Sequence, residues 1–193
     1  MRTGKLQSAA GYEHAFIPAL PWAAGRVYYT PAAPNAISSF NLPAGRTIYQ
    51  PFFIPPGSAL PNRVVLQVNP SAYSSGNVRL ALYSEGGGVP GALIEDLGNR
   101  SVATTGNKSF SPSQDIPPGW VWVAFNHNGA GSGQFRTFAY AGFSGRGLVG
   151  ARAGLTAATI YVDEDVSSGF PANANSDLQA SSDHWPLIWM TRV

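Results

Sequence analysis

Apolar and polar side chains alternate along many short stretches of the chain. Residues 63–68 (RVVLQV) place Val64, Leu66 and Val68 on one face, and residues 78–83 (VRLALY) repeat the pattern. A period of two is expected for a half-buried β-strand, because successive side chains of a strand point to opposite faces. The same reasoning predicts strands at residues 26–30, 47–54, 92–97, 108–111, 120–125, 135–140, 159–162 and 187–193.

Glycine and proline separate these stretches. Pro117, Pro118 and Gly119, for example, form a typical turn sequence. The break GGGVPG at residues 86–91 predicts a hairpin or a loop between sheets, because a phosphate-binding loop would need a helix and a lysine. Many short strands between closely spaced turns, with no convincing helix, predict a mainly β chain that folds as an antiparallel β-sandwich or jelly roll.

Residues 1–45 differ from the rest because they lack a sustained period and are rich in proline, alanine and glycine. A segment of this kind cannot bury a core of its own, so we expect an extended arm that lies on a partner. We place the anchoring arm at residues 1–25 and the sandwich domain at residues 26–193.

The stretch GWVWVAF at residues 119–125 is apolar on both faces of its predicted strand. A two-layer sandwich needs one apolar face per sheet, so the second face requires an arm, a third layer or a neighbouring subunit as cover. We expect Trp120, Trp122 and Phe125 at an oligomer interface, with cover by the chain itself as the alternative. Burying a tryptophan face contributes on the order of 2 kcal/mol, which would help to offset the entropy of association.

Charged residues make up only 11% of the chain, against roughly 25% in an average soluble protein. The net charge is +2 and the basic residues are scattered, whereas nucleic-acid binding favours a basic patch, so we expect no nucleic-acid partner. The absence of cysteine excludes disulfides and cysteine nucleophiles. No stretch approaches the roughly eighteen apolar residues of a membrane span, and the first residues lack a signal-peptide core, so we expect a protein made in the cytoplasm.

Catalytic motifs are also missing from the sequence. The fragment GFSGRG does not fit a GxSxG nucleophile elbow, and HExxH does not occur. His14, His127 and His184 lie far apart, without the spacing of zinc ligands. The ten acidic residues could supply a carboxylate pair for glycoside hydrolysis, but the sequence selects none. We therefore expect no enzymatic activity, no metal and no cofactor.

Polar residues that follow the aromatic strand form a candidate binding loop. Asn126, His127, Asn128 and Gln134 offer hydrogen-bonding groups to a sugar, or belong to a plain long loop. Trp185 is the aromatic candidate for stacking on a sugar ring, although the apolar residues after it favour a strand that enters the core.

A run of three acidic residues, Asp163, Glu164 and Asp165, follows the predicted strand TIYV. Three neighbouring carboxylates are candidate calcium ligands. Successive side chains of an extended chain diverge, however, so an exposed acidic turn is the favoured interpretation.

Several segments resemble a known family when they are taken in order. They are Tyr28-Tyr29 with Pro31, RTIYQPFFIP at 46–55, RVVLQV at 63–68, GNVRLALYSEGGGVPGALIEDLG at 76–98 and IPPGWVWVAF at 116–125. This set resembles β-sandwich modules in virion proteins of tailed bacteriophages, of the tail-fibre or receptor-binding type. The chain departs from the family at residues 120–122, where a Tyr-Trp pair is common, and residues 127–193 add no match.

The resemblance implies a structural or adhesive role in the virion, assembly into a homotrimer, and no catalytic residues. We therefore expect a non-enzymatic virion protein whose arm binds other virion proteins and whose loops at 86–91 and 126–134 face outward, with a host-surface glycan as a further partner. One alternative is a capsid decoration or head-fibre protein. The alternative from another class is a carbohydrate-binding module or a carbohydrate-active enzyme.

Overall fold

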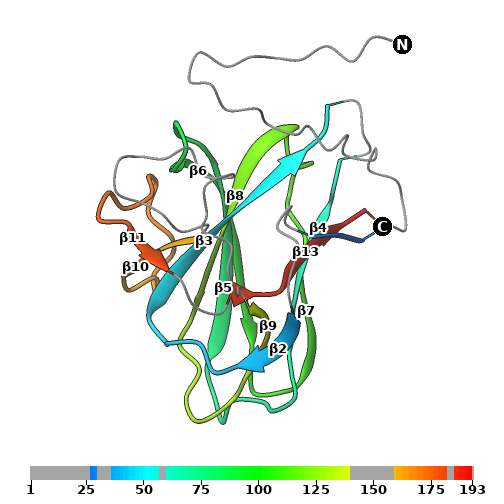
Figure 1. Ribbon diagram of the computed structural model, residues 1–193, viewed down its shortest axis with the longest axis vertical. Coiled ribbons are helices and arrows are strands. Elements are labelled where there is room, and N and C mark those ends of the chain that lie inside the picture. The colour runs from blue at the N-terminus through cyan, green and yellow to red at the C-terminus, as the bar shows by residue number, and fades with distance from the viewer. Residues whose placement is uncertain (1–26, 30–35, 57–59, 140–158, 182–184, 193) are drawn as a thin grey trace.

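The computed structural model describes residues 27–29, 36–56, 60–139, 159–181 and 185–192, and within them it contains thirteen β-strands and no helix. The strands pair antiparallel in two sheets that pack face to face (Figure 1). This architecture confirms the predicted mainly β, antiparallel sandwich. The predicted arm at residues 1–25 lies outside the described residues.

One sheet is built around β4, which pairs with β13 on one side and with β7 on the other. β1 extends this sheet beyond β13, and β9 connects it to β2 and β12. Its strands are β1 (Val27–Tyr29), β2 (Ala36–Phe40), β4 (Arg63–Val68), β7 (Gly106–Phe110), β9 (Phe135–Ala139), β12 (Trp185–Pro186) and β13 (Ile188–Thr191).

The other sheet has the strand order β11-β10-β3-β8-β5-β6. β8 lies near its centre and pairs with β3 and β5 along most of its length. Its strands are β3 (Arg46–Ile54), β5 (Asn77–Glu85), β6 (Pro90–Ser101), β8 (Gly119–His127), β10 (Thr159–Asp163) and β11 (Gln179–Ser181). We call it the six-stranded sheet.

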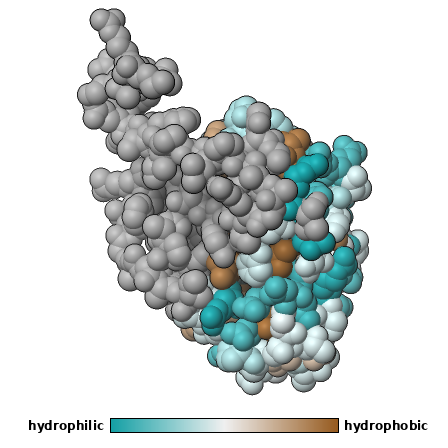
Figure 2. Space-filling view, turned by 90° about the vertical axis from the view of Figure 1, so that its right-hand side faces the viewer, coloured by the Kyte–Doolittle hydropathy of each residue, from teal (hydrophilic) through white to brown (hydrophobic). Residues whose placement is uncertain are grey.

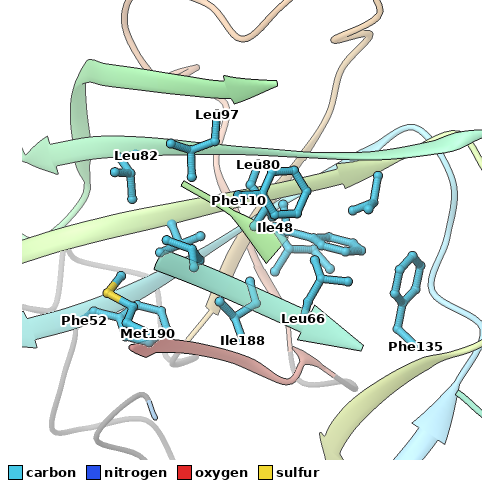
Figure 3. Packing of buried hydrophobic residues seen from close by; sticks show 14 of the residues in the cluster. Ile48, Phe52, Leu66, Leu80, Leu82, Leu97, Phe110, Phe135, Ile188 and Met190 are labelled. Atoms are coloured by element: carbon cyan, nitrogen blue, oxygen red, sulfur yellow. The ribbon is translucent and has the colours of Figure 1, made fainter. Parts of the chain in front are cut away.

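The inner core lies between the two sheets, and both contribute large apolar side chains to it (Figure 3). In β5 and β8 every second side chain points into this core, as the period of two along a strand requires. Main members are Ile48, Phe52, Leu66, Leu80, Leu82, Phe110, Phe125, Phe135, Ile188 and Met190, all of them buried.

The outer face of the six-stranded sheet is covered by the chain itself. Residues 164–178, which connect β10 to β11 and which we call the cover segment, pack Val166 and Phe170 against this face. The resulting outer cluster contains Tyr49, Ala81, Tyr83, Trp122, Ala124, Val162, Val166 and Phe170.

This cover corrects the predicted oligomer interface. Trp122 is 1% exposed in the outer cluster and Phe125 is fully buried in the inner core, so neither is free to contact another subunit. Trp120 alone of the three is exposed, at 36%, and its ring packs on Phe53 with 5.2 Å between centroids. On the side of the molecule seen in Figure 2, the coloured apolar residues form small separate areas among polar ones.

The GGGVPG sequence forms the turn of the β5–β6 hairpin, as predicted. The Gly86 amide donates to the Val89 carbonyl at 2.8 Å, and the Gly88 amide bonds the Glu85 carboxylate. Gly87 and Gly88 both have positive φ angles, which side chains disfavour, so glycine is needed at this turn.

Three strands were not expected from the sequence, namely β2, β11 and the two-residue β12. β2 is formed by residues 36–40, which lie in the stretch without a sustained period, and it pairs with β9 over five residues. β11 lies beyond the cover segment and pairs with β10. All three strands are short, and β2 pairs with a strand about a hundred positions away.

Candidate functional site

A polar pocket of about 400 Å³ lies at the end of the sandwich where β8 finishes. Strands β5, β6 and β8 form one side of it, and the first residues of the cover segment form the other. Its lining consists of Gly45, Asn77, Arg79, Asn99, Asn126, His127, Asn128, Glu164, Asp165, Val166 and Ser167. Asparagine amides and carboxylates therefore dominate the surface that a ligand would meet.

Asn126 lies at the base of the pocket and is 3% exposed. Its side-chain nitrogen donates to Thr47 Oγ1 at 2.9 Å and to the Glu164 carbonyl at 3.3 Å. This amide joins β8 to β3 and to the cover segment. The expectation that Asn126 displays its side chain to a ligand is therefore wrong, because burial and these two bonds commit its donor groups to the fold.

His127 is likewise a structural residue, since it is only 2% exposed. Its Nε2 lies 2.8 Å from the Leu42 carbonyl, which can only accept, so Nε2 carries the proton. Nδ1 then accepts the Gly129 amide proton at 3.2 Å. Burial lowers the pKa of His127, against a smaller opposing effect of the Leu42 and Pro43 carbonyls, which keeps the ring neutral.

Arg79 holds the cover segment against β5 and β6. Its Nε donates to both carboxylate oxygens of Asp96 at 3.1 Å, and its Nη1 donates to the carbonyls of Val166 and Ser167 at 3.0 and 3.1 Å. Asp96 in turn accepts the Phe170 amide at 3.1 Å. A guanidinium suits this position because its planar fork serves several acceptors at once.

The three acidic residues do not converge. Asp163 pairs with Arg46 at 3.0 Å, Glu164 accepts the Tyr49 hydroxyl at 3.3 Å, and Asp165 accepts bonds from Ser167. The bond from the Ser167 amide, and then that from its hydroxyl, lower the pKa of Asp165. No cluster of three or more metal-ligating side chains occurs among the described residues.

Some predicted site residues do meet here, and others do not. Asn126, His127 and Asn128 line the same pocket as Glu164 and Asp165, although 36 or more positions separate the two groups. Gln134 is half-buried outside the pocket, where its backbone bonds Asn69 and Ser71. The backbone of Trp185 pairs with Phe138, and its side chain lies outside the described residues.

The predicted loops at 86–91 and 126–134 lie at opposite ends of β5, and the first two residues of the second loop belong to β8. Asn128 bonds Asn77 at the start of this strand, whereas Gly86 follows its last residue, Glu85. Nine residues of extended chain separate the two ends by about 26 Å. These loops therefore cannot form one binding surface.

Asn77, Arg79 and Asn99 were not identified from the sequence, yet each lines the pocket. Arg79 could have been found from the sequence, because it is a charged residue on the outward face of an otherwise apolar strand. Asn77 and Asn99 gave none, because their proximity depends on the pairing of β5 with β6, which places Arg79 opposite Asn99.

The pocket is suited to binding a polar, uncharged ligand. The exposed amides of Asn77, Asn99 and Asn128 present donors and acceptors together, and a ligand with several hydroxyl groups matches both. Attack on a bound ligand by Ser167 with His127 as its base is disfavoured, because both ring nitrogens of His127 already bond backbone groups and Ser167 donates to Asp165. None of the described residues forms a helix that could span a bilayer.

No family model matches the chain, and no curated protein matches it. Solved structures that are similar to it include the following two. One is a clostridial cysteine protease, Cwp84, after propeptide cleavage, with 12% identity and a TM-score of 0.48 over 86% of this chain and 39% of that one. The other holds the cysteine protease and lectin-like domains of Cwp84, a surface layer associated protein of Clostridium difficile, with 14% identity and a TM-score of 0.44 over 80% of this chain and 35% of that one. The chain thus spans less than half the length of these structures.

Proposed function

We propose that the chain is a non-enzymatic structural protein of a tailed-bacteriophage virion, displayed as a tail-fibre or receptor-binding type module. The supporting observation is where the resembling segments lie. Residues 46–55, 63–68, 76–98 and 116–125 correspond to β3, β4, the β5–β6 hairpin and β8. They include β3, β8 and β5 inside the six-stranded sheet, its edge strand β6, and β4 in the middle of the other sheet, so the resemblance concerns the frame of the sandwich.

The polar pocket is the proposed contact with a host-surface glycan. Sugar hydroxyls both donate and accept, and the exposed asparagines around the pocket do the same. The alternative is that this pocket is a solvated end of the sandwich that binds no ligand. Measuring the binding of host polysaccharide distinguishes a glycan site from a solvated end.

Imaging of particles tests the location. Phage produced from the genome that encodes the chain is labelled with a gold-coupled antibody raised against residues 36–192. Label on the tail supports the receptor-binding module, and label on the head favours the decoration or head-fibre alternative. Purified particles without label and without peptides of this chain would contradict the proposal.

Deletion of residues 1–25 tests the anchor. The truncated chain is expected to keep its melting temperature and to be lost from the particles. A segment without a core of its own becomes ordered only by contact with other proteins, so its removal should affect attachment and not the sandwich. A truncated chain that enters particles normally but melts at a much lower temperature would refute anchoring by the arm.

Asn99→Ala tests the glycan contact. The exposed Asn99 lines the pocket, and one lost hydrogen bond of about 1.4 kcal/mol corresponds to about tenfold weaker binding of host polysaccharide. Asn107→Ala is the matched control, because Asn107 is exposed on β7 outside the pocket. Equal binding by both variants would contradict the contact. Release of reducing ends from the polysaccharide would favour the enzyme alternative.

Trimer formation is part of the same proposal. Trp120 is the predicted interface residue that the chain leaves partly exposed. Light scattering is expected to give the mass of three chains, and Trp120→Ser to lower it. A stable monomer at micromolar concentration would contradict the trimer.

A further inference from the structure

Asn128 and Gly129 form the only Asn-Gly pair in the sequence. Asn128 is exposed at the polar pocket, and Gly129 is half-buried beside it. Packing requires glycine at position 129, because an added Cβ would lie 2.6 Å from the Tyr73 ring. The same lack of a side chain leaves the Gly129 amide nitrogen unhindered toward the side-chain carbonyl of Asn128.

Cyclisation of such a pair is an acyl transfer within the chain. The backbone nitrogen of the glycine attacks Cγ of the asparagine, and the side-chain amide leaves as ammonia. The reaction is assisted by a base that accepts the proton of the attacking nitrogen and by a donor that stabilises negative charge on the carbonyl oxygen. Water then opens the five-membered succinimide.

A base is in contact with the attacking nitrogen. The Gly129 amide donates to Nδ1 of His127 at 3.2 Å. The bond between Nε2 and the Leu42 carbonyl, at 2.8 Å, fixes the tautomer in which Nδ1 carries no proton and its lone pair accepts the Gly129 amide. Burial lowers the pKa of His127, so Nδ1 is unprotonated at neutral pH.

A donor is in contact with the carbonyl oxygen of the same side chain. The backbone amide of Asn77 donates to Asn128 Oδ1 at 2.8 Å. The Asn128 amide donates to the Asn77 carbonyl at 3.0 Å, which holds this loop on the start of β5. The N–H of Asn77 is therefore positioned where charge develops on Oδ1 during attack.

We propose that the fold promotes deamidation at Asn128, with His127 as the base and the Asn77 amide as the oxyanion donor. The Gly129 nitrogen bonds to Cγ of Asn128 while its proton passes to His127 Nδ1, and the electron pair of the carbonyl moves to Oδ1. The Cγ–Nδ2 bond then breaks, and the leaving nitrogen takes the proton from Nδ1 and departs as ammonia. Hydrolysis of the succinimide by water yields aspartate or isoaspartate at position 128.

The product changes the polar pocket. An amide that donates and accepts becomes a carboxylate that only accepts, in a pocket already lined by Glu164 and Asp165. The third negative charge disfavours anionic ligands, and the lost donor weakens binding of hydroxyl groups. The pocket therefore exists in two chemical forms, one with asparagine at position 128 and one with aspartate or isoaspartate there.

The primary test compares the folded chain with the same chain unfolded in guanidinium at the same neutral pH. Aliquots are digested, and conversion at Asn128 is measured by mass spectrometry, with fragmentation that separates aspartate from isoaspartate. The folded chain is expected to react at least about tenfold faster, a smaller gain than the roughly hundredfold or more that a positioned base typically contributes in an active site. Asn175, whose side chain accepts a bond from the Asp177 amide, is the internal control and is expected to react no faster when folded. A folded rate at Asn128 equal to or below the unfolded rate overturns the proposal.

Two variants sharpen the result. Asn128→Gln places the amide one carbon too far for a five-membered ring and is expected to abolish the product. His127→Gln removes the base, so a variant that folds is expected to lose the advantage of the folded state. If the folded His127→Gln chain reacts at the original rate, the base role is refuted. If this variant does not fold, the comparison of folded and unfolded original chain still decides.

Discussion

The two faces of the six-stranded sheet are buried in different ways. On the inner face, side chains such as Leu80 and Phe125 meet a second sheet and are wholly apolar. On the outer face, Tyr49, Tyr83 and Trp122 meet an irregular segment. Each of these aromatic rings ends in a polar group with a partner, namely Glu164, the Pro171 carbonyl and Glu85, at 3.3, 2.8 and 2.8 Å.

The nature of the cover explains this difference. A second sheet satisfies most of its own backbone groups, so it is met mainly by hydrocarbon, with the buried Gln50, whose side-chain amide donates to the Pro186 carbonyl at 2.8 Å, as an exception. The cover segment lacks strand pairing over most of its length, and its carbonyls at positions 166, 167, 171 and 172 need donors from the sheet. Tyrosine, tryptophan and arginine supply both apolar area and such donors. A strand that reads as apolar on both faces therefore need not indicate a neighbouring subunit.

The largest expected effect is on the inner face. Phe125→Ala removes a fully buried ring whose centroid lies 5.1 Å from that of Phe135. We expect the free energy of unfolding to fall by about 4 kcal/mol, because a second sheet cannot settle into the cavity. Denaturant titration measures this loss. Ile94→Ala, at a side chain 43% exposed, is the control and should change stability by less than about 1 kcal/mol.

The outer face should respond less and more locally. Phe170→Ala removes a ring that is 7% exposed and contacts Tyr83 edge-on at 6.3 Å. We expect a loss of about 2 kcal/mol, because an irregular segment relaxes into the space more easily than a sheet does. Hydrogen exchange should become faster at the Leu93 and Ala174 amides. The Leu93 amide donates to the Ala172 carbonyl of the cover segment, and the Ala174 amide of this segment donates to the Gly91 carbonyl. A loss as large as that of Phe125→Ala would contradict the distinction between the faces.

The hydrogen bonds of Arg79 to Asp96 and to the cover segment should contribute less to stability than the Phe170 ring does. Arg79→Met keeps the stem but removes the bonds to Asp96 and to two carbonyls of the cover segment. The charged groups are 20% and 22% exposed, so solvent screening limits the expected loss to about 1.5 kcal/mol. Arg46→Met breaks the more exposed pair with Asp163 and is the matched control, with less than about 0.5 kcal/mol expected. Equal losses of unfolding free energy in the two variants would show that the Arg79 bonds do not hold the cover segment on the sheet.

Local pattern was sufficient to predict the sandwich. Alternation located β4 and β5, a short apolar run located β8, and glycine chemistry located the β5–β6 turn. These features depend on neighbouring residues, as the period of two and the φ of Gly87 do. β2 escaped prediction because its five residues become a strand only through pairing with β9, about a hundred positions away.

The candidate site was predicted less well for the same reason. The loop after β8 and the acidic run were each identified, but nothing in the sequence brings Asn128 and Asp165 to one pocket. Burial was the quantity most difficult to foresee. His127 has the polarity of a binding residue, yet the rings of Tyr73, Phe125 and Phe135 surround it at 5.0 to 5.8 Å.

The smallest expected effect concerns one hydroxyl on the outer face. Tyr83→Phe removes the bond to the Pro171 carbonyl while keeping the ring in the outer cluster. We expect a loss of about 1 kcal/mol at neutral pH, the net contribution of a typical hydrogen bond. Thermal unfolding in the same buffer measures it. A loss as large as that of Phe170→Ala would show that polar bonds, and not apolar packing, hold the cover.

The same variant should also alter the response to alkali. Burial raises the pKa of the Tyr83 phenol above its ordinary value of 10.0, with further effects of nearby groups such as Glu164. The folded chain therefore keeps a proton that the unfolded chain releases, so stability is retained below pH 10 and lost as the pH rises above it. Burial raises the pKa of Tyr49 and Tyr73 in the same direction, so Tyr83→Phe should reduce the alkaline loss without abolishing it. Unfolding curves of both chains that fall by the same amount above pH 10 would show that the Tyr83 phenol ionises as readily in the folded state as in the unfolded one.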